Sequence, residues 1–283
     1  MKEKEEKGID VKNWEEFLKE LENLREERCQ IESSTGRHPS ELLFRGHENS
    51  CWPLTTTLER PPYEREGMPF ADYYRLISRV RPQIESFTET TWDITVDPEI
   101  ARLLKEYDTL NLSMFPATAY SYMVYLRHHG FPSPLLDWTL SPYIAAFFAF
   151  RSVFKESGNV AIYVYCEKPE ACKVSSNKPR IQHVGPYLRT HRRHFLQQCE
   201  YTLCVAFEFE KEWRFAPHKE VYARGRHDQD VLQKFNIPST ERRKVLKLLD
   251  GDYNINAYSL FGSEESLMET LALRELDFKE HDF

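Results

Sequence analysis

The chain has 283 residues, long enough to bury about three quarters of the surface that its unfolded form would expose. Its formal net charge is -7, with 41% hydrophobic and 29% charged residues. This composition is ordinary for a globular protein, excludes a disordered chain and gives no sign of a general affinity for nucleic acid.

The sequence also bears on localisation. It contains no run approaching the roughly 18 apolar residues of a membrane span, and the opening MKEKEEKGID lacks the apolar stretch of a secretory signal. The six cysteines show no Cys-x-x-Cys spacing, so free thiols in a reducing cytosol are the simplest interpretation. We therefore expect a cytoplasmic protein without a membrane partner.

No linker rich in Pro, Gly or Ser divides the chain into balanced halves. We expect an N-terminal helical extension over residues 1–40 and one elaborated domain over residues 41–283. Apolar residues at helical spacing predict an amphipathic helix within the extension, from about Asn13 to Arg28.

The first half of the domain is expected to combine one short strand with several helices. Leu42–Arg45 has strand character, and we expect Gly46 to end this strand. Apolar spacing predicts helices from Phe70 onward, over Pro98–Tyr107 and over Ala117–His129. Ser141-Pro142 precedes eight almost wholly apolar residues, which predicts a buried helix with Ser141 as its cap.

The second half also mixes the two kinds of element. Val160–Cys166 and Tyr201–Phe209 have the β-branched and aromatic content of strands. Two late helices are predicted, one capped by Ser239 and ending at Gly251, and one capped by Ser263 and running through Leu276. Because no regular βαβ repeat is present, we predict an α+β fold with a mixed or antiparallel sheet flanked by several helices.

The polar residues that could carry chemistry gather before the predicted Ser141 helix. A helix N-terminus presents free N–H groups and a partial positive charge, so it attracts anions. Arg45, on a short apolar strand, is costly to bury unless Asp137 or a bound phosphate pairs with it. We therefore predict that Arg45, the loop from His128 to Ser141 and the start of the helix form one polar cleft.

The same residues also allow structural interpretations. Arg45 and Asp137 could form a purely structural ion pair, because buried charges in folded proteins are normally paired. His128 and His129 could cap the preceding helix, and Trp138 could belong to the core instead of forming a stacking surface.

A metal site is a further alternative, since His191, His194, Cys199 and Cys204 carry nitrogen and sulfur ligands. Their spacing is not that of a recognised zinc module. Three arginines crowd the same segment and would oppose a cation: Arg189, Arg192 and Arg193. We therefore expect no metal and favour contact with phosphate or an acidic partner there.

Several strings in the chain carry a resemblance to a known family. They are LLFRGHENSCWPLTTTLER (Leu42 to Arg60), LRHHGFPSPLLDWTLSPYIAAFFAF (Leu126 to Phe150) and HRRHFLQQCEYT (His191 to Thr202), with NIPSTERRKVLKLL and YSLFGSEESL near the end. These strings resemble the FRG domain family, which is named for the Phe44-Arg45-Gly46 type of motif. The chain departs from the usual family pattern at Pro134 and Gly262, and neither departure touches the proposed site.

A second resemblance concerns activity. A strand ending in Phe-Arg-Gly, followed by a Ser/Thr-x-Ser element that opens a helix, is similar to the first two motifs of NAD-dependent ADP-ribosyltransferases. The resemblance implies an ADP-ribosyltransferase-like fold with NAD as the substrate. By position, Arg45 would grip the phosphates and ribose of NAD, while Thr139 and Ser141 would position its nicotinamide half.

Those enzymes also use a later glutamate to orient the ribose. Glu265 is our candidate for this catalytic role, although acidic residues are expected in the first turn of a helix for dipole reasons alone. Glu208, Glu210 and Glu212 are its substitutes. The remaining candidates would contact the substrate: Gly46, His128, His129, Asp137, Trp138 and Gln198.

The leading hypothesis is thus an ADP-ribosyltransferase-like enzyme that passes ADP-ribose from NAD to a protein or nucleic-acid acceptor, or to water as an NAD glycohydrolase. Such an activity would suit a toxin or phage-defence effector. The alternative is a non-catalytic nucleotide- or nucleic-acid-binding module. In that case Arg45, the Ser141 helix end and the segment Arg189 to His194 bind phosphates, and Trp138 stacks on a base.

Overall fold

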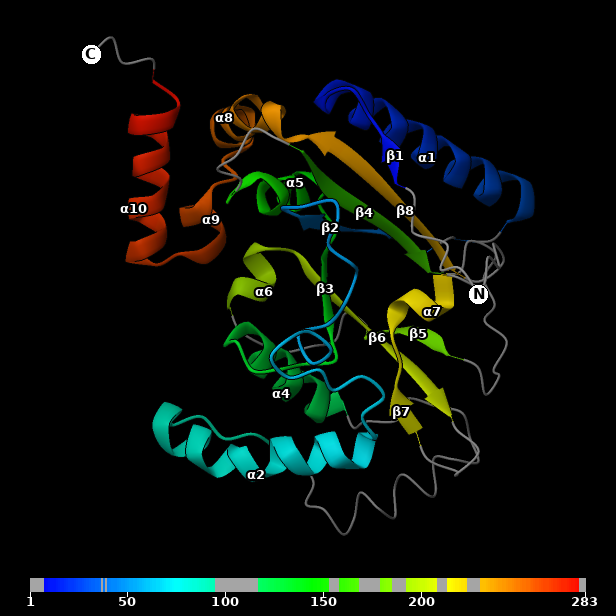
Figure 1. Cartoon of the computed structure of the whole chain (residues 1–283), viewed down its shortest axis with the longest axis vertical. Coiled ribbons are helices and arrows are strands. Elements are labelled where there is room, and N and C mark those ends of the chain that lie inside the picture. The colour runs from blue at the N-terminus through cyan, green and yellow to red at the C-terminus, as the bar shows by residue number, and fades with distance from the viewer. Residues whose placement is uncertain are drawn as a thin grey trace.

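The computed structural model describes residues 8–36, 38, 40–94, 117–152, 158–167, 179–184, 192–207, 213–222 and 230–279. Its centre is one mixed sheet with the strand order β1-β8-β4-β2-β3-β6-β5, in which β7 also pairs with β6 (Figure 1). The strands are β1 (Ile9–Asp10), β2 (Leu42–His47), β3 (Leu136–Thr139), β4 (Asn159–Glu167), β5 (Arg180–His183), β6 (Cys199–Phe207), β7 (Trp213–Phe215) and β8 (Asp230–Pro238). β1 runs parallel to β8, and the other described pairs are antiparallel.

Helices flank this sheet, which confirms the predicted α+β class. They are α1 (Trp14–Thr35), α2 (Phe70–Thr88), α4 (Ala117–His128), α5 (Pro142–Phe150), α6 (Arg192–Leu196), α7 (His218–Tyr222), α8 (Arg242–Tyr253), α9 (Ala257–Phe261) and α10 (Glu264–Ala272). A short 3-10 turn precedes α8 at Ser239–Glu241, and a π-helical turn extends α10 over Leu273–Asp277. None of the described helices is long and apolar enough to span a bilayer.

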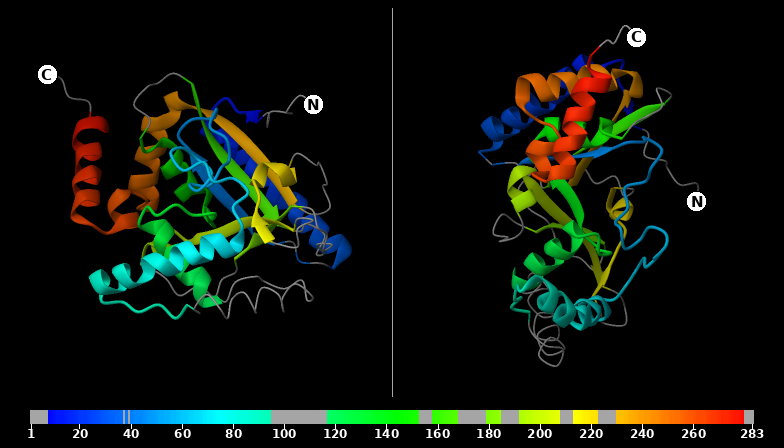
Figure 2. Two further views of the ribbon diagram at one scale, coloured as in Figure 1. Left: turned by 60° about the horizontal axis from the view of Figure 1, so that its bottom comes forward. Right: turned by 90° about the vertical axis from the view of Figure 1, so that its left-hand side faces the viewer.

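Two groups of helices cover one face of the sheet. One cluster joins α1, α5 and α8 to β2, β4 and β8, and a second joins α2 and α4 to β6. The two groups lie at opposite ends of the molecule (Figures 1 and 2). On the other face, a third cluster packs Leu54 and α7 against the strands. The sheet therefore has two separately covered halves, which meet at β2 and β3.

The two halves are joined by little main-chain pairing. β2 pairs with β4 along its whole length, from Leu42 to His47. Among the described residues, β2 and β3 pair at one register position, Phe44 with Thr139. Beyond that position the strands separate, with Arg45–His47 on one side and Leu136–Trp138 on the other. We call this opening the β2–β3 gap.

Gly46 sets the distance between β2 and α5. A Cβ atom at Gly46 would lie 2.0 Å from the Ala145 carbonyl oxygen and 2.7 Å from the Ala149 nitrogen. Both neighbours are backbone atoms of a buried helix, so they cannot move aside as a flexible side chain would. The sequence therefore needs glycine after Arg45 because α5 touches the strand there.

Several predicted boundaries need correction. Gly46 does not end its strand, because pairing with β4 continues to His47. Ser239 does not cap α8, since it begins the 3-10 turn, and α8 continues past Gly251 until Asn254 adopts the left-handed conformation. Ser141 and Ser263 cap their helices as expected, and Asn13 caps α1. The helix predicted over Pro98–Tyr107 lies outside the described residues.

We predict that Gly46→Ala destabilises the protein by on the order of 3 kcal/mol or more, because the added methyl group overlaps the backbone of α5. Urea denaturation would measure the loss. The control is Gly251→Ala within α8, where a Cβ atom meets nothing within 4 Å and helix propensity favours alanine. Equal stability of Gly46→Ala and the parent would contradict the close packing of β2 on α5.

Candidate functional site

A cavity of about 590 Å³ occupies the β2–β3 gap. This volume is within the range of about 300–1,000 Å³ that is typical of small-molecule sites. Residues from both faces of the sheet line the cavity: Phe44, Arg45, Gly46, His47, Glu48, Trp52, Pro53, Thr55, Arg60, His128, Asp137, Trp138, Thr139, Ala145, Phe148, Gln197 and Cys199. The site is thus built where the two halves of the sheet meet.

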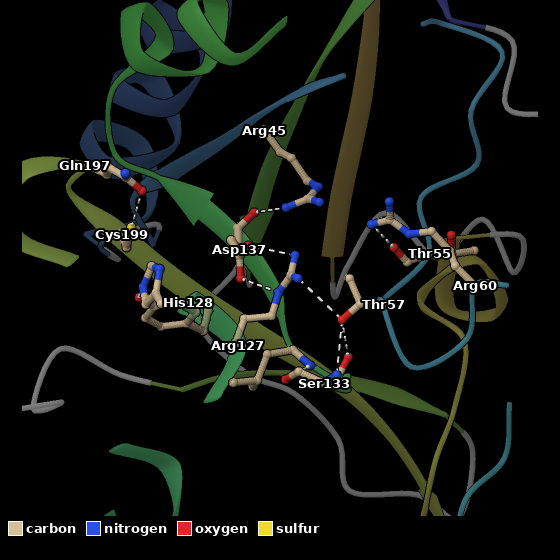
Figure 3. Close-up of polar contacts among 12 residues, drawn as sticks. Arg45, Thr55, Thr57, Arg60, Arg127, His128, Ser133, Asp137, Gln197 and Cys199 are labelled. Carbon is tan, nitrogen blue, oxygen red and sulfur yellow. Dashed lines mark hydrogen bonds and ion pairs between the residues drawn. The ribbon is translucent and has the colours of Figure 1, made fainter. Parts of the chain in front are cut away.

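Arg45 reaches across the gap between the strands (Figure 3). Its Nη1 donates to the Asp137 main-chain carbonyl at 2.5 Å, and its Nε donates to His47 Nε2 at 3.2 Å. The guanidinium therefore takes the place of main-chain pairing between β2 and β3. These two contacts hold its orientation and leave Nη2 without a hydrogen bond to the described residues.

The carboxylate of Asp137 binds a different arginine. Arg127 Nε donates to Asp137 Oδ1 at 3.0 Å, and its Nη2 lies 2.8 Å from Oδ2. Burial alone would raise the pKa of Asp137, but Arg127 and Arg45 outweigh it and hold this pKa below its ordinary value. Arg45 and Asp137 therefore lie together as expected, while the structural ion pair joins Asp137 to Arg127.

Two guanidiniums, those of Arg45 and Arg60, line the cavity. Burial, opposed by Asp137 and assisted by the nearby cations Arg127 and Arg60, lowers the pKa of Arg45 to about 10. Burial also lowers the pKa of Arg60, whose Nη2 donates to the Thr55 carbonyl oxygen at 3.0 Å. Both guanidiniums stay protonated at neutral pH, and within the described chain neither has a carboxylate hydrogen-bond partner.

Two neutral histidines lie close enough to Arg45 to feel its charge. Burial, followed by the charges of Arg45 and Arg60, lowers the pKa of His47 to about 3. Burial and Arg45 lower the pKa of His218 to about 3 as well. A neutral His47 that accepts a hydrogen bond at Nε2 carries its proton on Nδ1. His47 therefore orients Arg45 without neutralising its charge.

The N-terminus of α5 offers less to an anion than the sequence predicts. Ser141 Oγ accepts from the Ile144 N–H at 3.3 Å, and Pro142 has no N–H to donate. The Thr139 hydroxyl donates to the Gln197 carbonyl oxygen at 2.8 Å and accepts from the Ser141 N–H at 3.2 Å. Thr139 lines the cavity and Ser141 does not, so these two residues mainly fix the turn from β3 into α5.

The two tryptophans of the site have different environments. Trp138 is 2% exposed, lies against Tyr165 and donates its indole N–H to Thr202 Oγ1 at 2.8 Å. It lines the cavity but belongs to the core, so its ring has no open face for stacking on a base. Trp52 is 48% exposed and lines the same cavity. Sequence reasoning missed Trp52, although its position in the Leu42–Arg60 string could have suggested it.

The other predicted contact residues are divided between the cavity and the surface. His128 lines the cavity, whereas His129 is exposed and packs against Tyr125. Gln198 is exposed in a left-handed turn, and it is the neighbouring Gln197 that is buried beside the cavity. A shift of one residue therefore separates the predicted glutamine from the one that faces the site.

The predicted catalytic glutamate does not face the cavity. Glu265 is exposed in the first turn of α10, where Ser263 lowers its pKa through a side-chain hydrogen bond. Its substitutes Glu208, Glu210 and Glu212 lie outside the described residues. The carboxylate that lines the cavity besides Asp137 belongs to Glu48, two residues after Gly46.

The described ranges contain no group of three or more His, Cys, Asp or Glu residues that could hold a metal ion. Cys199 and Cys204 belong to hydrophobic clusters on opposite faces of the sheet, so they do not converge. His191 and Arg189 lie outside the described residues.

The buried histidines predict a pH-dependent stability. In the unfolded chain each takes up a proton near its ordinary pKa of 6.5, but in the folded protein only near pH 3. The unfolded state thus binds more protons between these values, and stability falls as the pH falls below about 6.5. We expect each histidine to cost about 2 kcal/mol of stability between pH 7 and pH 5.

Urea denaturation at these two pH values would measure this loss. His218→Gln should lose about 2 kcal/mol less than the parent between pH 7 and pH 5, whatever its stability at pH 7. If His218→Gln and the parent lost the same stability between pH 7 and pH 5, His218 would take up its proton in the folded protein as it does in the unfolded chain.

Comparison with known proteins bears on one part of the chain. Residues 40–158 match the family model of the FRG domain. This segment includes β2, the Arg127–Asp137 pair, the turn from β3 and α5, whereas Gln197 and Cys199 enter the cavity from beyond it. No curated protein and no solved structure matches the chain significantly. The chain therefore contains an FRG domain, as its sequence motifs indicate.

Proposed function

We propose that the cavity binds a nicotinamide dinucleotide and that the protein is an NAD-dependent enzyme of the ADP-ribosyltransferase kind. The observation that carries the proposal is the pair of partly buried guanidiniums, Arg45 and Arg60, which line one cavity without a carboxylate hydrogen-bond partner in the described chain. Buried charges in folded proteins are normally paired. A pyrophosphate would supply the missing negative charge.

The orientation of Arg45 suits this role. Its contacts to His47 and to the Asp137 carbonyl immobilise the guanidinium before any ligand arrives. An arginine held in this way loses little side-chain entropy on binding, and its planar fork matches phosphate oxygens. Arg60 presents a second cation to the same cavity. Together they would clamp the two phosphates and leave the rest of the ligand to the apolar wall formed by Ala145 and Phe148.

Cleavage of the ribosyl-nicotinamide bond develops positive charge on the ribose. A carboxylate close to that centre would stabilise the transition state. We assign this role to Glu48, because it lines the cavity and its carboxylate makes no hydrogen bond or ion pair with the described residues. Glu265 is replaced in this role because it faces solvent on α10. Trp52, half-exposed at the same cavity, would stack on a planar ring of the ligand.

A second candidate function is non-catalytic nucleotide binding. The specific observation in its favour is that Thr139 and Ser141, which the resemblance assigns to positioning the nicotinamide, use their hydroxyl groups to fix the turn before α5. Such a module would bind NAD or ADP-ribose through the same arginines without releasing nicotinamide. Chromatographic assay of nicotinamide release from NAD, beside calorimetric binding of ADP-ribose, separates the two functions.

Arg45→Lys tests the phosphate clamp. Lysine keeps the charge but cannot contact His47, the Asp137 carbonyl and a phosphate together. We expect ADP-ribose affinity to fall by about 10- to 100-fold, corresponding to one or two charge-assisted hydrogen bonds, while the melting temperature changes by only a few degrees.

Arg127→Lys is the matched comparison, because Arg127 forms the bidentate pair with Asp137 and does not line the cavity. It should lower thermal stability more than affinity. An Arg45→Lys variant that melts far earlier but binds ADP-ribose normally would show that Arg45 is structural and would end the proposal.

Glu48→Gln tests the catalytic carboxylate. The amide keeps the size of the side chain but removes its charge, so we expect nicotinamide release to fall by about 100-fold with little change in ADP-ribose affinity. Glu265→Gln is the control and should retain the parent activity, since its side chain is exposed on α10. Loss of activity in Glu265→Gln but not in Glu48→Gln would restore the assignment predicted from the sequence.

A further inference from the structure

A chain of three polar side chains leads away from the cavity. His128 lines the cavity and its Nε2 lies 2.7 Å from the Tyr201 hydroxyl. His194, on α6, has its Nδ1 3.1 Å from the same hydroxyl. Tyr201 is fully buried, while His194 is partly exposed. The hydroxyl therefore connects a histidine in the cavity with a histidine that reaches solvent.

Hydrogen bonding and ring packing both hold the two histidines against Tyr201. A phenol donates one hydrogen bond and can accept another, so one histidine nitrogen donates to it and the other accepts from it. The His194 ring stacks on the Tyr201 ring, with centroids 5.6 Å apart and an interplanar angle of 15°. The His128 ring meets Tyr201 at 85°. Both imidazoles are thus held in place against the phenol.

Charged and titratable groups border both ends of the chain of hydrogen bonds. At the cavity end they are Asp137 of β3, whose pKa responds to His128, and Cys199 of β6. Arg127 neighbours His128 on α4. At the outer end, burial lowers the pKa of His194, and the charge of Glu200 of β6 only partly opposes this shift. Burial raises the pKa of the Tyr201 phenol well above its ordinary value, so the phenol stays protonated at neutral pH.

We propose that Tyr201 relays a proton from His128 in the cavity to His194 at the surface, with His128 as the base for the attacking hydroxyl. This inference rests on the proposed function and names the route by which its released proton leaves. The attacking group is water or an acceptor hydroxyl, either of which must lose one proton when ADP-ribose is transferred. A relay through Tyr201 removes this proton from a cavity that already holds the cations Arg45 and Arg60.

The oxygen of the attacking group bonds to the ribose carbon, and the carbon–nitrogen bond breaks with its electron pair leaving on neutral nicotinamide. The hydroxyl proton passes to His128 Nδ1, the proton on His128 Nε2 passes to the Tyr201 oxygen, and the Tyr201 proton passes to His194 Nδ1. His194 then releases one proton to solvent, which is the proton that the overall reaction produces.

Tyr201→Phe removes the hydroxyl and keeps the buried ring. We expect nicotinamide release to fall at least about 100-fold, the lower end of what a positioned proton-transfer group contributes, with ADP-ribose affinity unchanged. Tyr73→Phe is the matched control, because Tyr73 is equally buried and its hydroxyl donates to the Pro132 carbonyl at 3.0 Å, outside the cavity. It should lose stability alone. His194→Ala should lose activity that added imidazole restores, because its site opens to solvent, whereas imidazole should not rescue Tyr201→Phe.

A readout without substrate separates this inference from the proposed function. In a pH titration followed by NMR of the histidine rings, the His128 signals of the parent should shift as His194 titrates, and Tyr201→Phe should abolish that response. Independent titration of the two histidines in the parent, or full activity of a folded Tyr201→Phe variant, would overturn the relay. Coupled titration in a protein that releases no nicotinamide would instead keep the hydrogen-bonded path and refute the proposed function and the catalytic role of His128.

Discussion

The backbone of β2 touches the backbone of α5 at Gly46, and the position of Arg45 depends on that contact. A side chain at this position would push α5 away from the sheet. With glycine there, Phe44 and the apolar face of α5 share one core. Arg45, which lies between Phe44 and Gly46, points to the other face of the strand. In the Phe-Arg-Gly motif, Gly46 therefore meets a packing requirement, and Arg45 beside it supplies the charged group of the site.

The sheet is continuous in topology but barely paired between β2 and β3. Arg45 fills part of the opening by donating to a main-chain carbonyl of β3. Such a bond stabilises the junction without cancelling the charge, unlike the bidentate pair between Arg127 and Asp137. The cost of keeping Arg45 charged in a partly buried position is thus met by ordinary hydrogen bonds, and an anion would still gain by binding beside it.

The sequence was informative for helix starts that depend on a local side-chain cap. The caps at Ser141 and Ser263 follow from side chains that bond the first turn of their own helices, whereas Ser239 begins a 3-10 turn before α8. The family strings also located Arg45 and Asp137 in one cavity. The charge partner of Asp137 could not be predicted, because Arg127 lies on α4 and reaches Asp137 only when α4 packs beside β3. β8, with its polar and apolar residues interleaved, becomes a strand through its long pairing with β4.

The other assignments at the site depend on how distant segments pack together. Thr139, Ser141 and Glu265 were assigned by their order along the chain, whereas the cavity is defined by the separation of two strands. Glu48 and Trp52 follow the Phe-Arg-Gly motif closely and line the cavity, but no periodic pattern distinguishes them in a loop. Gln197 faces the cavity in place of Gln198 because the left-handed turn at Gln198 directs that residue to solvent.

The central claim is that the β2–β3 gap receives the phosphates of a nucleotide between Arg45 and Arg60. A crystal structure of the protein with ADP-ribose would test it most directly. We predict phosphate oxygens within hydrogen-bond distance of both guanidiniums, with the Arg127–Asp137 pair unchanged. Phosphates bound elsewhere on the surface, with the cavity filled by solvent alone, would contradict the account.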